Sequence, residues 1–342
     1  MRGVHAGASS GGVATATSSA APGGISGAMI LAAGFGTRLR PLTDERPKPL
    51  VWIGDRPLLA HLVERLARAG VQRVVMNTFH RAEDFGGAAL SALALPVTVL
   101  REVEILGTAG GVANAAEALG AGNVLVWNGD ILVDLDVATL GATHAAAVRD
   151  KKVGATLGVA PRARGTGTVG VGAGGEVVRL RGERFGEEVA GGDFVGVQVI
   201  APELRRRLPA QGCLVGDGYL PWLREGRALS TFAAPAAWDD VGTLGTYLHA
   251  NARWLGGRGE DAFVGEGAVV EAGVSVIGSV VGAGARVRGS GVLRGCVVWP
   301  GAEVVVEGEL SGAVVTAGGV TAPAGGLKAT EGAPAWWRGA SG

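Results

Sequence analysis

Apolar and polar positions divide residues 28–140 into alternating strand and helix patterns. Four short runs of small or branched apolar side chains are typical of buried strands: residues 30–33, 74–77, 97–100 and 124–127. Leucine and valine recur at helical spacing over residues 58–66, Gly70 follows as a helix C-cap, and a small-residue helix is expected over 107–119. This alternation predicts an α/β fold: a doubly wound, mostly parallel, Rossmann-like sheet with helices on both faces.

The pattern is more mixed between residues 150 and 250. Strands are expected over 153–159 and 192–200, a short helix over 221–224 and a longer helix over 244–255. These elements and the preceding ones define one predicted domain, residues 28–257.

A different period starts near Phe263. Large apolar residues recur at steps of six, interrupted once by a step of five: Val264, Val270, Val276, Val281, Val287, Leu293 and Trp299. Hexapeptide spacing predicts a short, left-handed parallel β-helix over residues 258–330, with an irregular Gly/Val-rich sheet as the alternative. Because so short a solenoid exposes its ends, we expect it to mediate a homo-oligomer.

The two ends of the chain differ from the rest. Residues 1–27 are mostly Gly, Ala, Ser and Thr, so they bury too little apolar surface to offset their ordering entropy. We expect a disordered extension there, or a true start near Met29. Residues 331–342 form a tail in which Trp336 and Trp337 are candidates to cap the last coil.

Composition narrows the class of protein. Of 342 residues 47% are hydrophobic, and the formal net charge is zero, which argues against a nucleic-acid or anionic-membrane partner. No apolar run approaches the ~20 residues that a transmembrane helix needs. Cys213 and Cys296 lie far apart in the sequence and form no metal-type cluster. The two thiols could pair, but reduced thiols are expected in a cytoplasmic protein.

The most distinctive chemistry lies in residues 29–51. The first strand runs into a loop with Gly34 and Gly36, followed by Thr37, Arg38 and the proline-flanked Lys48. Glycines let backbone N–H groups approach a phosphate closely, and cations neutralise its charge. Arginine suits phosphate oxygens bidentately, while the prolines restrict where the lysine points. The stretch therefore predicts an enzyme that handles a nucleoside triphosphate.

Two common phosphate motifs do not fit this loop. No Gly-Lys-Ser/Thr follows the glycines, so it is not a Walker A motif, and the third glycine of the dinucleotide fingerprint is missing. The alternative is a glycine-rich turn with solvated arginines. The concentration of basic residues around a proline-braced lysine favours the phosphate site.

The same stretch resembles a known signature. Gly-x-Gly-Thr-Arg-Leu-x-Pro-Leu-Thr at residues 34–43 and Pro-Lys-Pro at 47–49 resemble the motif of sugar-1-phosphate nucleotidyltransferases, the nucleotide-sugar pyrophosphorylases. The resemblance extends more weakly over residues 28–310. It implies attack of a sugar-1-phosphate oxygen on the α-phosphate of a nucleoside triphosphate, with release of pyrophosphate. Leu-Gly-Thr-Ala-Gly at 106–110, together with the hexapeptide domain, is most similar to mannose-1-phosphate guanylyltransferases, which implies GTP and mannose 1-phosphate.

The resemblance also implies roles for individual residues. Arg38 and Lys48 match the catalytic cations, and Asp130 and Asp240 match two ligands of Mg²⁺, a metal that prefers a few carboxylates plus phosphate oxygens. From the residues alone, Asp130 fits a turn and Asp240 a helix N-cap, and Asp239 competes with its neighbour. The expected nucleotide-binding residues are Leu31, Ala33, Gly34, Gly36, Thr37, Gly107, Thr108 and Gly110.

The expected sugar site departs from the family pattern. Many members carry Glu-Lys-Pro, whose lysine contacts the sugar phosphate, but no lysine of this chain lies in such a motif. The nearest counterparts are Glu183 and Arg184; arginine also binds phosphate, although a solvated surface arginine fits the sequence equally well. Gly196 lies in a segment that resembles the strand lining the sugar site.

Three alternatives remain open at the level of sequence. Uridylyl or thymidylyl transfer to another sugar 1-phosphate is the first. The second is a non-catalytic subunit that senses nucleotide-sugar, which predicts lost catalytic residues, yet the matching cations and aspartates are all present. The third is acyl transfer by the β-helix, which predicts a histidine base, whereas residues 263–320 contain no histidine.

Overall fold

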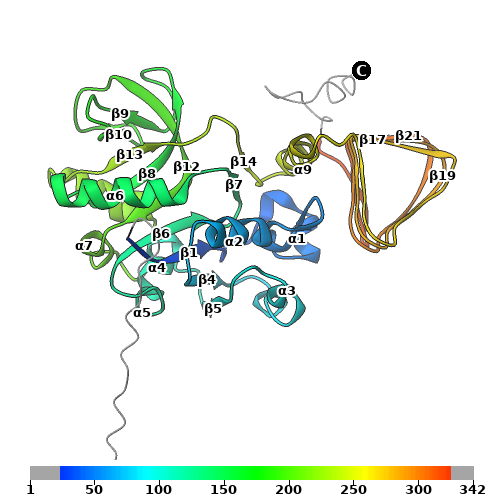
Figure 1. The fold of residues 1–342 in the computed structure, drawn as a ribbon, viewed down its shortest axis with the longest axis horizontal. Helices are drawn as coiled ribbons and strands as arrows, with labels where there is room; N and C mark the ends of the chain where they lie inside the picture. Colours follow the sequence, from blue (N-terminus) through cyan, green and yellow to red (C-terminus); the bar gives the residue numbers. More distant parts are fainter. Residues whose placement is uncertain (1–23, 325–342) are drawn as a thin grey trace, which may run out of the picture.

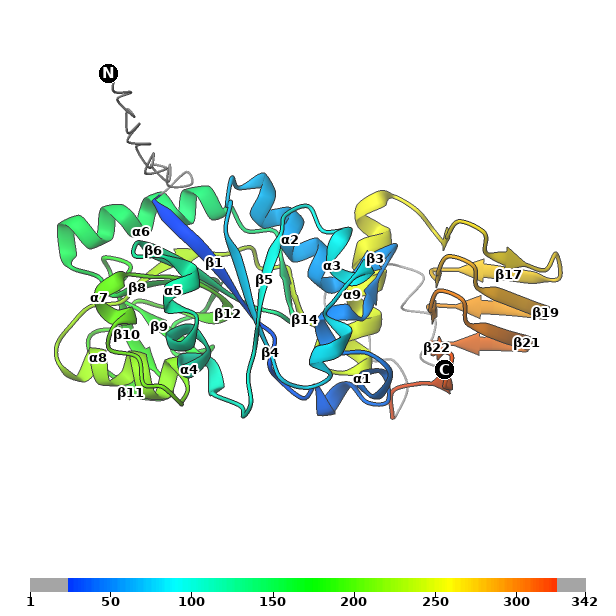
Figure 2. The ribbon, with the colours of Figure 1, turned by 90° about the horizontal axis from the view of Figure 1, so that it is seen from below.

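The computed structural model describes residues 24–324, which form an α/β domain and a parallel β-helix joined through helix α9 (Leu244–Arg258) (Figures 1 and 2). Residues 1–23 of the predicted disordered extension lie outside the described residues. The predicted cap, Trp336 and Trp337, lies outside them as well. The strand β1 begins at Ile25, three positions before the predicted domain start. That part of the prediction is wrong, because Ile25 is buried and pairs with Asn123.

The α/β domain is built on one ten-stranded mixed sheet. Its first half is parallel, in the order β6 (Asn123–Asn128), β1 (Ile25–Leu31), β4 (Val74–Thr78), β5 (Val97–Arg101). Beyond β6 the sheet continues through β12 (Ala190–Ile200), which runs antiparallel to β6, β8 (Ala155–Arg162) and β9 (Val169–Val171). The remaining strands are β10 (Val177–Leu180), β11 (Glu183–Arg184) and β13 (Ser230–Ala233). The α/β prediction is confirmed, and the parallel order holds for the half that carries the glycine loop.

Helices cover both faces of this sheet. Alternate residues of a strand face opposite sides, and Ile30 and Met29 of β1 belong to two separate hydrophobic clusters. The Ile30 cluster includes the buried stripe of α2 (Leu58–Arg68), as predicted, and the Met29 cluster includes α4 (Gly107–Asn114) and α5 (Ala116–Leu119). A break at Ala115 divides the single helix predicted there.

The remaining helices are short except for α6 (Val137–Lys151). The sequence pattern did not indicate this helix, because its apolar stripe is weak. The Asp136 side chain caps it by accepting a hydrogen bond from Thr139 N. The remaining α-helices are α1 (Leu42–Glu45), α3 (Ala88–Ser91), α7 (Pro202–Arg205) and α8 (Leu220–Arg224). Short 3₁₀ or π turns are η1 (Thr37–Leu39), η2 (Lys48–Leu50), η3 (Ala82–Asp84) and η4 (Leu214–Tyr219). None of the helices within residues 24–324 is long and apolar enough to cross a membrane.

The C-terminal strands wind into a triangular solenoid, seen along its axis in Figure 1. One face stacks β15 (Phe263–Val264), β18 (Val280–Val281), β20 (Val297–Val298) and β22 (Val314–Thr316) in parallel. The other two faces pair β16 (Val269–Val270) and β17 (Val274–Ile277) with β19 (Arg286–Arg294), which pairs with β21 (Glu303–Ser311). The predicted β-helix is therefore confirmed, and β23 (Gly319–Thr321) closes it by antiparallel pairing with β22.

One predicted ladder position is wrong. The stacked residues are Val264, Val281, Val298 and Val315, so Trp299 lies one position beyond the ladder. Its indole Nε1 instead donates to the Tyr247 hydroxyl at 2.9 Å, in a buried contact between the β-helix and α9. The two cysteines are free thiols, as expected.

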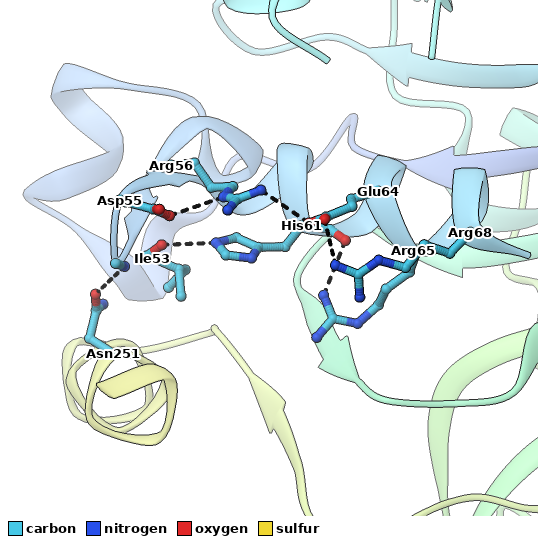
Figure 3. Close-up of polar contacts among 9 residues, drawn as sticks. Ile53, Asp55, Arg56, His61, Glu64, Arg65, Arg68 and Asn251 are labelled. Carbon is cyan, nitrogen blue, oxygen red and sulfur yellow. Dashed lines mark hydrogen bonds and ion pairs between the residues drawn. The ribbon is translucent and has the colours of Figure 1, made fainter. Parts of the chain in front are cut away.

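Helix α9 also contacts the hairpin of β2 (Trp52–Ile53) and β3 (Arg56–Pro57). Asn251 Oδ1 accepts a hydrogen bond of 2.8 Å from Gly54 N, and His61 Nε2 of α2 lies 2.8 Å from Ile53 O (Figure 3). Gly54 has φ 62°, and a Cβ there would overlap the Trp254 indole, so only glycine fits this turn.

Candidate active site

A cavity of about 320 Å³ opens at the carboxyl ends of β1, β4 and β6. Ligands of open α/β sheets occupy this position. Eight of the predicted site residues line it: Leu31, Ala33, Gly34, Gly36, Lys48, Gly107, Thr108 and Asp130. Sequence segments that lie up to about a hundred positions apart thus meet in one place.

The two loop glycines serve different purposes. Gly36 has φ 65°, and a Cβ there would lie 2.8 Å from Thr43 Cγ2; the Thr43 hydroxyl donates to Gly36 O at 3.0 Å. Gly34 is exposed to the cavity, and no atom lies within 4 Å of the position a Cβ would take. The first glycine is therefore left open for a ligand, whereas the second is required by the fold of the loop.

The predicted cations and carboxylates form one cluster. Lys48 Nζ lies 3.0 Å from Asp130 Oδ2, and the two side chains are 13% and 28% exposed. Strand β14 (Trp238–Asp240) pairs with β7 (Ile131–Val133), and Val241 N donates to Asp130 O at 2.9 Å, so Asp240 lies beside Asp130. Arg38 lies close to Asp240, because both side chains approach Gly242. A Cβ built on Gly242 would lie 2.9 Å from Asp240 Oδ1 and 3.2 Å from Arg38 Nη2.

Asp240 is an unsatisfied group. Its Oδ1 is buried and accepts no hydrogen bond from the described residues. Burial raises the pKa of this carboxyl, and the nearby Asp130 raises it further, while Lys48 and Arg38 act in the opposite direction. An unpartnered carboxylate oxygen beside a second carboxylate is chemically suited to a cation.

The neighbouring Asp239 faces elsewhere. It is 5% exposed, and its two oxygens lie 2.9 Å from His249 Nδ1 and 2.9 Å from Arg253 Nε of α9. Its charge is therefore used within the fold, which supports the assignment of Asp240 rather than Asp239 to the site.

The donor set fits Mg²⁺. Among residues 24–324 no group of three or more His, Cys, Asp or Glu side chains is placed to hold a metal. Asp130 and Asp240 would therefore be the only acidic protein ligands, with phosphate oxygens and water completing the shell. Magnesium is commonly bound in this way, through one or two carboxylates plus substrate phosphates.

The predicted base-binding segment forms one wall of the cavity. Ile105, Gly107 and Thr108 line it. Ala109 N donates to Gly212 O at 2.9 Å, and a Cβ on Gly107, whose φ is 73°, would overlap that carbonyl. Gly110 is buried against Ala210 and does not line the cavity, so its smallness serves packing.

A buried polar chain, missed by the sequence analysis, joins the two walls. Asn77 Oδ1 accepts from Ala32 N at 2.9 Å, and Asn77 Nδ2 donates to Glu102 Oε1 at 2.7 Å. Glu102 Oε2 in turn accepts from Leu106 N at 3.1 Å. Asn77 is the last residue of the predicted strand 74–77, so the rule that ligands sit at strand ends contained the signal.

Other predicted residues do not line the cavity. Thr37 and Arg38 are exposed. Glu183 forms an ion pair with Arg224 of α8, and Arg184 is 66% exposed with Glu188 3.8 Å away, so neither lines the cavity. Gly196 does approach it: with φ 72°, a Cβ there would lie 2.7 Å from Nδ2 of Asn128, a lining residue.

Comparison with known proteins gives a consistent result. The family model described as nucleotidyl transferase matches residues 27–256. A mannose-1-phosphate guanylyltransferase of Mycobacterium tuberculosis is 40% identical over 121 residues, covering 34% of this chain and 33% of that protein. A mannose-1-phosphate guanyltransferase of Schizosaccharomyces pombe is 31% identical over 244 residues, covering 67% of this chain and 64% of that protein. The chain therefore spans less than two thirds of the length of either relative.

The fold has solved counterparts as well. HddC from Yersinia pseudotuberculosis superposes with a TM-score of 0.55 at 24% identity, covering 66% of this chain and 98% of that one. This likeness concerns the fold of the α/β domain. Since the family match spans almost the whole of that domain, from β1 into α9, the chain belongs to the nucleotidyl transferase family.

Proposed function

We propose that this protein transfers a guanylyl group from GTP to mannose 1-phosphate, forming GDP-mannose and pyrophosphate. The observation that carries the proposal is the cluster of Lys48, Asp130, Asp240 and Arg38 beside a glycine-lined cavity. Both reactants are anions, so the site has to supply cations and in-line positioning more than acid–base chemistry.

Each part of the cluster then has a role. The open space at Gly34 lets the triphosphate approach the backbone, and Lys48 exchanges Asp130 for phosphate oxygens. Arg38, exposed beside Asp240, neutralises charge on the departing pyrophosphate. Mg²⁺ held by Asp130 and Asp240 would neutralise phosphate charge and orient the phosphates for displacement.

The choice of GTP and mannose 1-phosphate rests on the two relatives and on the segment at 105–108 that lines the cavity. The sugar site is proposed near Gly196 and Asn128, next to Asp130. Glu183 and Arg184 already have charged partners, so they would reach a sugar only after rearrangement. We further propose a cytoplasmic homo-oligomer formed through the β-helix, and a monomeric mass in solution would contradict that part.

A substrate screen tests the proposal. Pyrophosphate release is measured for GTP, ATP, UTP and dTTP, each with mannose, glucose and N-acetylglucosamine 1-phosphates in the presence of Mg²⁺. The highest kcat/KM is expected with GTP and mannose 1-phosphate, and Arg38→Ala should abolish it. Preference for UTP or dTTP would overturn the substrate assignment, and no release with any pair would overturn the enzymatic function.

A further inference from the structure

The β-helix contacts the segment that carries the two catalytic cations. Helix α1 lies between Arg38 and Lys48 in the sequence and beside the last coil in space (Figure 2). The Thr316 hydroxyl donates to Glu45 Oε1 at the end of α1, and Gly318 N donates to the same oxygen at 3.2 Å. Two donors of the C-terminal domain thus converge on one carboxylate of the catalytic domain.

The other side of α1 braces the glycine loop. Thr43 is 1% exposed, and its hydroxyl bonds to Gly36 O, as described above. A Cβ on Gly36 would lie 3.5 Å from Lys48 Cβ, so the loop and the lysine are packed together. Since α1 has only four residues, its position depends on such contacts and not on helix formation itself.

The β-helix contacts the carboxylate side of the site as well. Trp299 donates to Tyr247 of α9, a helix that begins at Leu244, four residues after Asp240, with Thr243 as its N-cap. The same helix holds Gly54, in the hairpin that follows Lys48, through Asn251 (Figure 3). The β-helix is therefore attached to both halves of the cluster, through α1 to the cations and through α9 to the carboxylates.

We propose that Thr316 and Glu45 are positioning residues: through them the β-helix holds Arg38 and Lys48 in place relative to Asp130 and Asp240. The inference rests on the proposed nucleotidyl transfer. Neither residue lines the cavity. Their contact fixes the position of α1 and so the position of the glycine loop that packs against it. In reactions that depend on positioning, a shift of about an ångström in a reacting or binding group lowers the rate strongly.

Kinetic measurements on three matched variants test this role. Thr316→Val removes the hydroxyl but keeps the shape, and it should lower kcat for nucleotidyl transfer about tenfold with a small change in unfolding temperature. Thr316→Ser restores the donor and should recover most of the rate. Thr321→Val is the control, because among the described residues the Thr321 side chain makes no hydrogen bond. Equal rates for Thr316→Val and Thr321→Val would overturn the proposal.

A second measurement needs no substrate. Amide hydrogen exchange over residues 36–50 should be faster in Thr316→Val than in the wild type or in Thr321→Val. Unchanged exchange there would overturn the positioning role even in an active enzyme. If the wild type showed no pyrophosphate release, the proposed function would fail, and the exchange rates would still decide whether the β-helix orders this segment.

Discussion

Replacing Asp240 by asparagine should stabilise the metal-free protein and abolish turnover. The side chain keeps its shape, but a half-buried carboxylate, whose Oδ1 is fully buried, becomes a neutral amide. The folded protein disfavours that carboxylate, because burial and the adjacent Asp130 raise its pKa and Oδ1 accepts no hydrogen bond from the described residues. The substitution relieves this cost and removes one of the two ligands proposed for Mg²⁺.

The magnitude follows from the contacts. A buried charged group with an unsatisfied oxygen costs about 1–3 kcal/mol. Attraction of the Asp240 carboxylate to Arg38 and Lys48 offsets part of this cost. Both attractions are weakened, because Arg38 is exposed and Lys48 is already paired with Asp130 at 3.0 Å. We expect a net gain of about 1 kcal/mol, which corresponds to a rise of about 2–4 °C in unfolding temperature for a protein of this size class.

Calorimetric unfolding in excess EDTA measures the stability, and pyrophosphate release in Mg²⁺ measures turnover. Asp239→Asn is the matched control. It should lower stability, because Asp239 is buried and pairs with Arg253 and His249, and it should retain turnover. An Asp240→Asn protein that is less stable than the wild type in EDTA, or that turns over normally, would refute the reasoning.

Three further predictions concern the loop, the polar chain and pH. Gly34→Ala should leave stability within about 0.5 kcal/mol and raise KM for the nucleotide, whereas Gly36→Ala, at φ 65°, should cost about 1–2 kcal/mol in urea unfolding; the opposite order would contradict their assigned roles. Asn77→Ala should cost about 2–4 kcal/mol by the same assay, since it removes the partners of Ala32 N–H and of Glu102 Oε1; a cost below 1 kcal/mol would argue against the polar chain. His144 is fully buried and its pKa is lowered from 6.5 to about 4, so the unfolded chain binds its proton first as pH falls. The contribution of neutral His144 to the free energy of unfolding should be fully present above pH 6.5 and fall by about 3 kcal/mol towards pH 4. His144→Phe should flatten this part of the plot of stability against pH.

Local patterns predicted the elements that positioned the site. The first strand was expected over 30–33 and is found at Ile25–Leu31, so its existence but not its bounds followed from the apolar pattern. The stripe on α2 follows from side-chain periodicity, and the valine repeat predicted the solenoid. The register of the solenoid was less predictable: Val298 rather than Trp299 continues the ladder, because pairing between coils and not spacing within one coil decides which residue stacks. The helix α6 was missed because mostly small residues give it a weak stripe.

The candidate site residues were likewise predictable where a local motif marks them, and not where tertiary contacts decide their role. Arg38, Lys48, Asp130 and Asp240 were identified through motifs that depend on a few consecutive residues. Glu183 and Arg184 were proposed from a weak counterpart of a motif, and the structure instead places them on β11 at the edge of the sheet, paired with Arg224 of α8 and with Glu188. Asn77 is indicated in the sequence only by its position at the end of the predicted strand 74–77, and Glu102 has no local sequence signature, so this buried polar pair was missed.

By itself, the sequence determined the chemistry available to this protein and the elements that carry it, because backbone conformation and residue type act over a few neighbouring positions. Only the tertiary structure showed why Asp240 and not Asp239 enters the site, since the Asp239 carboxylate pairs with His249 and Arg253 of α9. It also decided that Glu45 meets Thr316, a contact between residues 271 positions apart in the chain. Such contacts depend on the sum of all packing in the folded chain, which no short segment of sequence encodes.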